Sequence, residues 1–396
     1  RGAAEEAIAA VWTDVLGLAR VGRGDNFFEL GGDSILSLQI VARLRLAGWK
    51  VAPRQIFERQ TVAQLAAVAM PADALRAAVG DVQGEAPLLP FQHEFFEMDM
   101  PVRAHWNQAV LLKNREPLQL PAFRQTLRAV VQQHDSLRLR YRQDAGGLWH
   151  QTYEAVESVP EDQSAELVWV RHAADAAQVA PLCEEAQRSL DLAHGPLVRA
   201  LAIELPDGDS RLLLVVHHLV VDGVSWRILL EDLQAAYRQS LAGQPVALPA
   251  TSSSCKDWAV ALQGYAKVHG DELAHWQSLA DVPAALPCAR PHGSNTAADQ
   301  ESVELRLDQA TTEAFLKDAP AAYRTQANDL LLTALGRALC AWSGHGRVLV
   351  DLEGHGREDL FAHIDLSRTV GWFTTLFPVA LDPLGAHGEA LKRVKE

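Results

Sequence analysis

Cysteine is scarce in this chain of 396 residues, and the four that occur lie far apart: Cys183, Cys255, Cys288 and Cys340. No C-x-x-C pair is present, so the common zinc-binding spacings are excluded and a disulfide framework is disfavoured. The pattern indicates reduced cysteines in a cytoplasmic protein. We therefore predict neither a metal site nor a disulfide.

Long apolar runs and excess positive charge are also lacking. The longest apolar runs, such as 212–216, fall far short of the ~20 residues of a spanning helix, and no charged-then-apolar leader opens the chain. Fifty acidic against 36 basic residues give a net charge of −14, which argues against a nucleic-acid partner. Because the first residue is Arg1, we expect a piece of a longer protein.

What is present is an ordinary globular composition, with 48% hydrophobic and 22% charged residues. A chain of this size suits two or three domains, each with its own core. Apolar residues recur at helical spacing over 5–18 and 34–46, and Thr61 is a suitable N-cap for a third helix through residue 68. Residues 1–70 thus read as a small helical bundle, and 71–86 as a linker.

After residue 87, strand-like runs alternate with helices, as in an α/β fold. In the first half the expected strands are 109–113, 137–142, 197–205 and 212–217, and the expected helices are 123–134 and 224–241. A second lobe of similar pattern has expected strands at 302–307, 347–352 and 376–381, and expected helices at 309–318, 325–342 and 389–396.

Ser34 stands at the start of a predicted helix, directly after two glycines and Asp33. The free N–H groups and the dipole of a helix start favour a phosphate at such a serine. The same residues also suit a plain helix cap. The local pattern leaves both interpretations open.

A pair of histidines, His217 and His218, ends the apolar strand expected at 212–217. Because successive strand side chains point to opposite faces, only one imidazole can face a given cleft. Asp222 follows just before the helix expected at 224–241, where an aspartate caps a helix whether or not catalysis occurs. A satisfied core histidine is the plain alternative for His218.

Six stretches carry a family resemblance. DNFFELGGDSILS at 25–37 resembles the peptidyl carrier domain of nonribosomal peptide synthetases, in a form typical of carriers just upstream of epimerization domains, and HHLVVDGVSW at 217–226 resembles the condensation/epimerization superfamily. Within that superfamily, the motifs of epimerization domains are resembled by LLPFQ at 88–92, HWNQ at 105–108, EGHGRE at 353–358 and RTVGWFTTLFPV at 368–379.

The resemblance implies a fold class and domain ranges. A small all-α four-helix carrier bundle at 1–70 and a linker at 71–86 would precede an α/β two-lobed domain like chloramphenicol acetyltransferase. Its N-terminal lobe would span 87–263 and its C-terminal lobe 264–396. The family's later motifs, which include a tyrosine region, are absent, so we expect the second lobe to be truncated.

The resemblance also implies site residues. Ser34 would carry a covalent 4′-phosphopantetheine, and His218 and Glu353 would be the catalytic pair. His217 would have a supporting role. Asp222 and Arg138, the last residue of HDSLR at 134–138, would form a structural ion pair. No metal or pyridoxal is implied.

The implied activity is that of an isomerase in antibiotic biosynthesis, acting on an L-aminoacyl or peptidyl thioester. Inversion at Cα needs a base and an acid on opposite faces, and stabilisation of the enolate oxygen. The implied partners are the chain's own carrier domain, an upstream adenylation domain, a phosphopantetheinyl transferase and a downstream condensation domain. We expect no membrane partner.

Three rival functions remain. A condensation domain would join two carrier-bound groups with the same His218 but should lack EGHGRE. A stand-alone acyltransferase would not need a carrier fused upstream. A catalytically silent docking platform should lose the second histidine of the pair, which is intact.

Overall fold

The computed structural model describes residues 2–395 apart from 73–80, 157–163, 207, 295 and 324, and only the backbone of residues 34, 164, 165 and 321. The chain divides into two compact units. The first contains Arg1–Val268 and His355–Thr375, and the second contains His269–Gly354 and Leu376–Glu396. The C-terminal lobe that we predicted as one continuous segment is thus interrupted, because residues 355–375 belong with the first unit.

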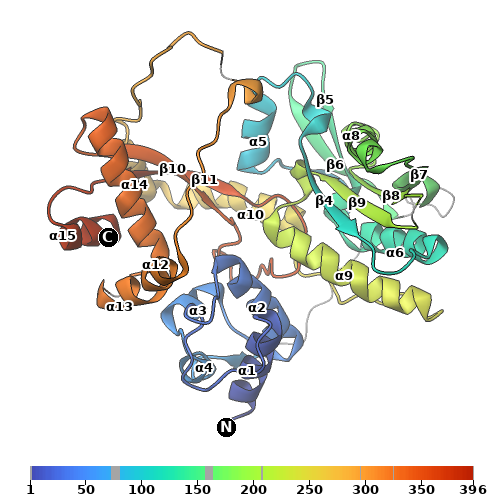
Figure 1. The fold of residues 1–396 in the computed structure, drawn as a ribbon, viewed down its shortest axis with the longest axis horizontal. Coiled ribbons are helices and arrows are strands. Elements are labelled where there is room, and N and C mark those ends of the chain that lie inside the picture. Colours follow the sequence, from blue (N-terminus) through green and yellow to red (C-terminus); the bar gives the residue numbers. More distant parts are fainter. Residues whose placement is uncertain are drawn as a thin grey trace. The chain divides into compact units, whose positions relative to one another are not determined.

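The N-terminal part of the first unit is helical (Figure 1), with α1 Ala3–Val15, α2 Ser34–Leu46, α3 Pro53–Glu58 and α4 Val62–Ala66. Its core contains Ile8, Trp12, Phe27, Ile40 and Leu44, all fully buried. Helical periodicity predicted α1 and α2, and the Thr61 cap predicted α4, but neither signal predicted the short α3. The expectation of an all-α domain also missed a strand pair, β1 Trp49–Lys50 with β2 Met70–Pro71.

Two caps set the helix starts here. The Asp33 carboxylate accepts the backbone N–H of Leu36 at 2.7 Å, so α2 begins at Ser34, as predicted. The Thr61 hydroxyl accepts the N–H of Gln64 at 3.3 Å at the start of α4. Such side chains satisfy N–H groups that have no partner within the helix.

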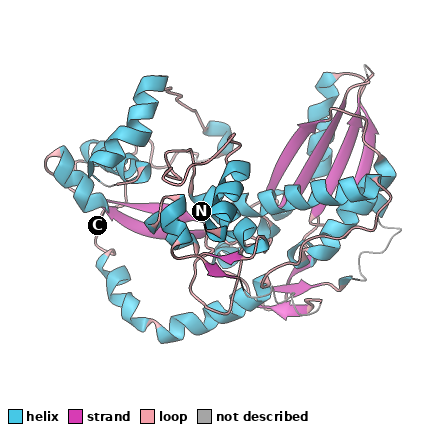
Figure 2. Ribbon diagram, turned by 90° about the horizontal axis from the view of Figure 1, so that it is seen from below, coloured by secondary structure: helices cyan, strands magenta, loops and turns pink. Residues whose placement is uncertain are grey.

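A four-stranded sheet with the order β4-β9-β8-β7 organises the rest of the first unit. Its strands are β4 Asn107–Lys113, β7 Val168–His172, β8 Val198–Glu204 and β9 Ser210–His217. Strand β9 runs antiparallel between β4 and β8, and β7 is parallel to β8. Figure 2 shows these strands side by side with helices against them.

Both faces of strand β9 are covered, which explains its continuous apolar run. Leu214 and Val216 pack in a cluster with residues of α6 Leu120–Gln133 and α9 Gly223–Leu241. Leu213 and Val215 point to the other face and pack in a cluster with α8 Val179–Gln187. The two-residue period of a strand thus places alternate residues in two cores.

A second sheet, of three antiparallel strands with the order β3-β6-β5, completes the first unit together with three more helices. These elements are β3 Gly84–Ala86, β5 Leu139–Gln143, β6 Trp149–Tyr153, α5 Pro90–Glu97, α7 Ser164–Leu167 and α10 Cys255–Val268. The end of the predicted linker therefore forms strand β3, while residues 73–80 of that linker lie outside the described residues.

The second unit has the paired strands β10 Val348–Gly354 and, apart from its first residue, β11 Thr375–Leu381. Its helices are α11 Leu273–Ser278, α12 Gln309–Glu313, α13 Ala319–Tyr323, α14 Ala327–Ser343 and α15 His387–Lys395. The core of this unit includes Cys340, Val348 and Leu381. Both strands and the helices α12, α14 and α15 agree with the sequence-based expectations.

The strand expected at 302–307 is wrong, because the described structure shows no strand there. Its alternating Val303 and Leu305 are 92% and 91% exposed. An alternating pattern forms a strand only where a neighbouring strand supplies hydrogen bonds and another element covers the apolar side chains. No helix among the described residues has the length and apolarity to cross a membrane.

Candidate functional site

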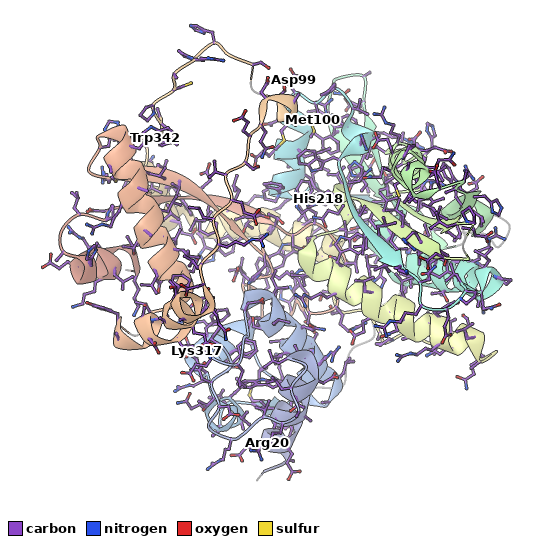
Figure 3. All side chains as sticks on the ribbon, viewed as in Figure 1. Arg20, Asp99, Met100, His218, Lys317 and Trp342 are labelled. Atoms are coloured by element: carbon purple, nitrogen blue, oxygen red, sulfur yellow. The ribbon has the colours of Figure 1, made fainter. Side chains whose placement is uncertain are left out.

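His218 lies directly after the end of strand β9, in a single 3₁₀ turn over residues 218–220 (Figure 3). Its backbone N–H donates to the carbonyl of Trp106 at 2.8 Å, which ties it to the start of β4. Asp222 caps α9 four residues later. The motif HHLVVDG is thus a strand end, a tight turn and a helix start in direct succession.

The His218 ring is held on three sides. Its Nδ1 lies 2.9 Å from the carbonyl oxygen of Val221. Its Nε2 lies 2.9 Å from the side-chain nitrogen of Gln108, on β4. The Trp372 ring covers it at a centroid distance of 4.3 Å and an interplanar angle of 36°. An oriented, partly exposed imidazole of this kind can transfer a proton.

His217 has a different environment, since its side chain is fully buried. Its Nε2–H donates to the carbonyl oxygen of Arg103 at 2.8 Å, and its Nδ1 accepts the N–H of Leu219 at 3.2 Å. Burial lowers the pKa of His217 to about 4, and the hydrogen bond to Arg103 only partly opposes this. At neutral pH His217 is therefore an uncharged group that fixes the turn.

Asp222 lies in a buried network with Arg357 and Ser225. The guanidinium Nη2 of Arg357 is 3.1 Å from each carboxylate oxygen of Asp222 and 3.0 Å from the Ser225 hydroxyl. The same carboxylate accepts the N–H of Ser225 at 2.7 Å and that of Phe373 at 3.2 Å. One aspartate therefore caps α9, neutralises a buried arginine and holds the segment that carries Trp372.

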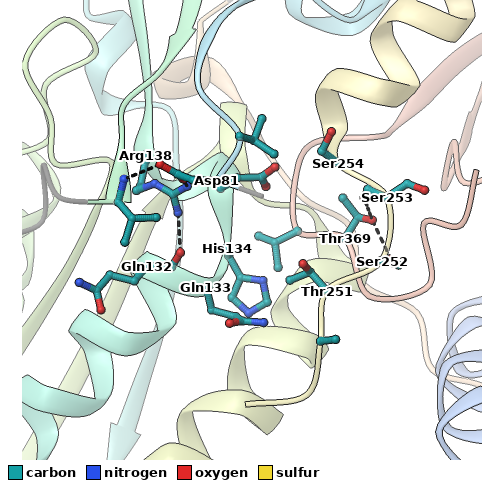
Figure 4. A pocket seen from close by; sticks show the side chains of 15 residues that line it. Asp81, Gln132, Gln133, His134, Arg138, Thr251, Ser252, Ser253, Ser254 and Thr369 are labelled. Carbon is teal, nitrogen blue, oxygen red and sulfur yellow. Dashed lines mark hydrogen bonds and ion pairs between the residues drawn. The ribbon is translucent and has the colours of Figure 1, made fainter. Parts of the chain in front are cut away.

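The predicted ion pair between Arg138 and Asp222 is wrong. Arg138 donates to Asp81 at 2.7 Å, on the wall of a cavity of about 330 Å³ (Figure 4). Its guanidinium also donates to the carbonyl oxygens of Val131, Gln132 and Glu154. The partner of Asp222 is Arg357, which stands 135 positions away in the sequence.

The EGHGRE stretch at 353–358 supplies Arg357 to this network. Gly356 has a φ of +63°, and a Cβ there would come within 1.6 Å of the Phe373 carbonyl oxygen, so only glycine fits. Arg357 is buried and lies over the Phe373 ring at 4.3 Å. Arg357 is therefore part of the core of the first unit, whereas the neighbouring Glu358 is exposed.

Glu353 belongs to the second unit, where it is an exposed residue near the end of β10. The expected strand ended at residue 352, whereas β10 continues to Gly354, so Glu353 lies within the strand and not after it. Because His218 belongs to the first unit, the two candidate catalytic residues lie in different compact units.

The glycines before Ser34 form a turn that only glycine permits. Gly31 has a φ of +96°, and a Cβ on Gly32 would lie 2.4 Å from the ring of Phe27, which is fully buried. Asp33 is the N-cap, and Ser34 is the first residue of the 13-residue helix α2. A serine at a helix start with a compact turn before it suits a covalently bound phosphate.

The sequence singled out Gln108, Trp226, Trp372 and Arg357 only as parts of motifs, not for what they contact. A signal existed for Gln108, because β4 and β9 are both apolar runs and could be expected to pair. The register that sets Gln108 opposite Val216 was not predictable from the runs alone. Among the described residues, no three His, Cys, Asp or Glu side chains are arranged to hold a metal ion.

Comparisons with known proteins cover nearly the whole chain. Residues 6–69 match the family model for a phosphopantetheine attachment site, and residues 82–396 match the model for a condensation domain. One of the subunits of linear gramicidin synthase from Brevibacillus parabrevis is 45% identical over 99% of this chain. The chain spans only 8% of the length of that relative.

Solved structures also resemble most of this chain. The epimerization domain from the third module of tyrocidine synthetase B is 36% identical, with a TM-score of 0.71 over 81% of this chain and 72% of that one. The first condensation domain of the CDA synthetase is 20% identical, with a TM-score of 0.58 over 78% of this chain and 72% of that one. The second likeness shows the fold alone.

Proposed function

Because this chain belongs to the condensation-domain family of nonribosomal peptide synthetases, with a phosphopantetheine carrier domain ahead of it, we propose that it epimerizes a carrier-bound thioester. The substrate is an L-aminoacyl or peptidyl group, and the product is a mixture of L and D forms. The observation that carries the proposal is the 36% identity to an epimerization domain in a matching fold. The proposed architecture is the two-lobed one of chloramphenicol acetyltransferase.

The carrier domain is the site of covalent 4′-phosphopantetheine attachment, and we assign that role to Ser34. The helix start, the Asp33 cap and the tight glycine turn support this assignment. When bound, the group supplies a thioester that acidifies the adjacent Cα–H. An upstream adenylation domain would load it, a phosphopantetheinyl transferase would install the arm, and a downstream condensation domain would take the product.

The residues of this chain supply the proton transfers. His218, fixed by Val221, Gln108 and Trp372, is assigned as one acid-base group. Glu353 is assigned as the other, acting on the opposite face of the same Cα. In each direction one group removes the proton from one face of Cα and the other group donates a proton to the opposite face, so inversion needs both. N–H groups at the start of α9 are assigned to the enolate oxygen.

Peptide-bond formation is the second candidate, because the model that matches residues 82–396 is that of a condensation domain. In that reaction the same His218 would serve the attack of an amine on a thioester. The two candidates differ in outcome: condensation transfers a group between carriers, whereas epimerization exchanges the Cα hydrogen without transfer.

The test is made on the full-length protein, loaded at the carrier with an L-aminoacyl-pantetheine deuterated at Cα. Deuterium loss and chirality are measured together in ordinary water. We expect the parent to lose deuterium and form the D isomer, and His218→Ala and Glu353→Gln each to stop inversion. At least one of the two variants should retain deuterium loss from one isomer.

Two controls decide the interpretation. Ser34→Ala should gain no mass from a phosphopantetheinyl transferase, and an addition that persists would remove the Ser34 assignment. A Glu353→Gln protein that equilibrates the isomers at the parental rate would exclude Glu353. A parent that transfers its group to an offered aminoacyl carrier without losing deuterium would be a condensation enzyme.

A further inference from the structure

A chain of hydrogen bonds runs from Trp226 through Gln108 to His218, from three separate elements of the first unit. The indole N–H of Trp226, on α9, donates to the side-chain oxygen of Gln108 at 2.7 Å. The side-chain nitrogen of Gln108, on β4, lies 2.9 Å from Nε2 of His218. We propose that Gln108 and Trp226 are positioning residues that hold His218 in its neutral, Nδ1-protonated form. This inference rests on the proposed function.

The first step is the orientation of the Gln108 amide. An indole N–H can only donate, so the group it meets must be the amide oxygen. The NH₂ group of Gln108 therefore points to His218. An amide NH₂ group can only donate, so the atom facing it must accept.

The second step is the tautomer of His218. Its Nδ1 faces the carbonyl oxygen of Val221 at 2.9 Å, and a carbonyl oxygen can only accept. The proton of the neutral ring therefore sits on Nδ1, and Nε2 carries the lone pair. Both contacts select the same tautomer, the one whose Nε2 can take a proton.

The third step is what happens when His218 is protonated. A proton on Nε2 would face the NH₂ group of Gln108, which sets two donors against each other. Turning the amide over would relieve that contact but would set the NH₂ group against the Trp226 indole N–H. Trp226 thus fixes the amide with its NH₂ group toward Nε2, which favours the tautomer that carries its proton on Nδ1. The substrate Cα–H must displace the amide to reach Nε2, so Gln108 does not itself transfer the proton.

The titratable and charged groups next to His218 do not set its tautomer in place of Gln108. His217, the preceding residue, is kept uncharged at neutral pH by burial, which lowers its pKa to about 4. Asp222, at the start of α9, is occupied by Arg357 and two backbone N–H groups. Trp372, which covers the ring, carries no charge.

The experiment uses Gln108→Glu and Trp226→Phe in the full-length loaded protein. A carboxylate at position 108 accepts a hydrogen bond from Nε2–H and stabilises the imidazolium. At pH 7 we expect deuterium loss to fall about 10-fold or more in Gln108→Glu and to recover as the pH rises, since a carboxylate at hydrogen-bond distance shifts such titrations by about 1–3 units and a shift of about 2 units would leave only a few per cent of an ordinary imidazole neutral. Trp226→Phe frees the amide to turn over and should give a smaller loss, about 5-fold, with the same recovery.

The matched control is Gln143→Glu, which adds the same charge on β5, where the glutamine side chain is exposed and donates to Gly147. It should keep the parental pH profile. A merely structural role for Gln108 would lower activity equally at every pH, so an acid limb that does not move in Gln108→Glu overturns the proposal.

A readout independent of activity separates this proposal from the proposed function. In protein labelled with ¹⁵N-histidine, the signals of His218 are identified by their loss in His218→Ala. At pH 7 we expect a protonated Nδ1 and an unprotonated Nε2 in the parent, and a protonated Nε2 in Gln108→Glu. A parent with its proton on Nε2 overturns the proposal, whether or not the protein epimerizes anything.

Discussion

Two buried arginines in the first unit, Arg357 and Arg138, have the same task but different surroundings. Each has a side chain that is only 2% exposed, and each forms an ion pair with one aspartate. The Asp222 carboxylate beside Arg357 is 6% exposed, whereas the Asp81 carboxylate beside Arg138 is 22% exposed. Water can therefore reach one pair more readily than the other.

The two aspartates also differ in what else they hold. Asp222 caps α9 and accepts the N–H of Phe373, so it links three segments. Asp81 accepts the N–H of Val156 and contacts Gln83, near the start of the larger domain. Arg138 retains three backbone carbonyls as partners without Asp81. Arg357 likewise retains the carbonyl oxygens of Leu366 and Thr369 and the Ser225 hydroxyl without Asp222. The two pairs therefore differ in the exposure of the carboxylate and in what else that carboxylate holds, and the comparison teaches that these decide the cost of losing it.

The largest effect is expected for Asp222→Ala, because it leaves the Arg357 charge buried and uncaps α9. Removing one partner of a buried pair typically costs about 3–5 kcal/mol. We expect a loss of that size in the free energy of unfolding, measured with urea at pH 7. Asp222→Asn, which keeps an oxygen for the cap, should lose less.

A double-mutant cycle checks the pairing itself. Arg357→Met combined with Asp222→Ala should cost clearly less than the sum of the single changes, because no unpaired charge remains. Arg138→Met combined with Asp222→Ala should be additive. If the coupling appears with Arg138 instead, the network around Arg357 is not the one that stabilises the protein.

The local parts of this comparison were predictable from the sequence, and the long-range parts were not. The helix start at Ser34, the strand before His217 and the cap at Asp222 all follow from residues within a few positions of each other. The pair Asp222–Arg357 depends on how a segment 135 positions later returns to the first unit. No local spacing of residues predicts that the segment with Arg357 packs in the first unit.

The strand that was wrongly predicted at 302–307 also shows that a local pattern does not determine long-range pairing. Its alternating Val303 and Leu305 satisfy the local pattern of a strand, yet both are almost fully exposed. A strand also needs an adjacent edge, which is a property of the whole fold. For Gln108 the missing information was likewise strand register, since one residue of slip would turn its side chain to the other face.

A smaller effect, and one that depends on pH, is expected from His217. Burial places its pKa at about 4 in the folded protein, below the ordinary value of about 6.5. The unfolded chain binds the proton first, so stability falls as pH drops from about 6.5 to 4, at about 1.4 kcal/mol per pH unit. Between pH 7 and 5 we expect the parent to lose about 2 kcal/mol through this group.

The measurement compares urea unfolding at pH 7 and pH 5 for the parent, His217→Gln and His172→Gln. The first variant should lose less stability on acidification than the parent. His172 has a side chain that is 78% exposed, so its replacement should leave the dependence unchanged. Equal pH dependence in all three proteins would show that His217 is not the neutral buried group described above.

The smallest effect is expected for Asp81→Asn. Partial burial alone would raise the pKa of Asp81, but hydrogen bonds from Val156 and Gln83 and the charge of Arg138 hold it below the ordinary value. A lowered pKa stabilises the fold at pH values above about 4 and loses that effect as pH falls through the folded value. Because the carboxylate is partly exposed, we expect a loss of about 1 kcal/mol at pH 7.

Urea unfolding at pH 7, 5 and 3.5 checks this last expectation, with the exposed Asp99→Asn as the control for removal of one negative charge. The difference between the parent and Asp81→Asn should be constant from pH 7 to 5 and should shrink at pH 3.5, where Asp81 of the parent begins to take up its proton. A loss as large as that of Asp222→Ala would mean that Arg138 depends on its carboxylate as strongly as Arg357 does. The three carbonyl oxygens around Arg138 would then not compensate for the missing charge, and solvent access would not be what separates the two pairs.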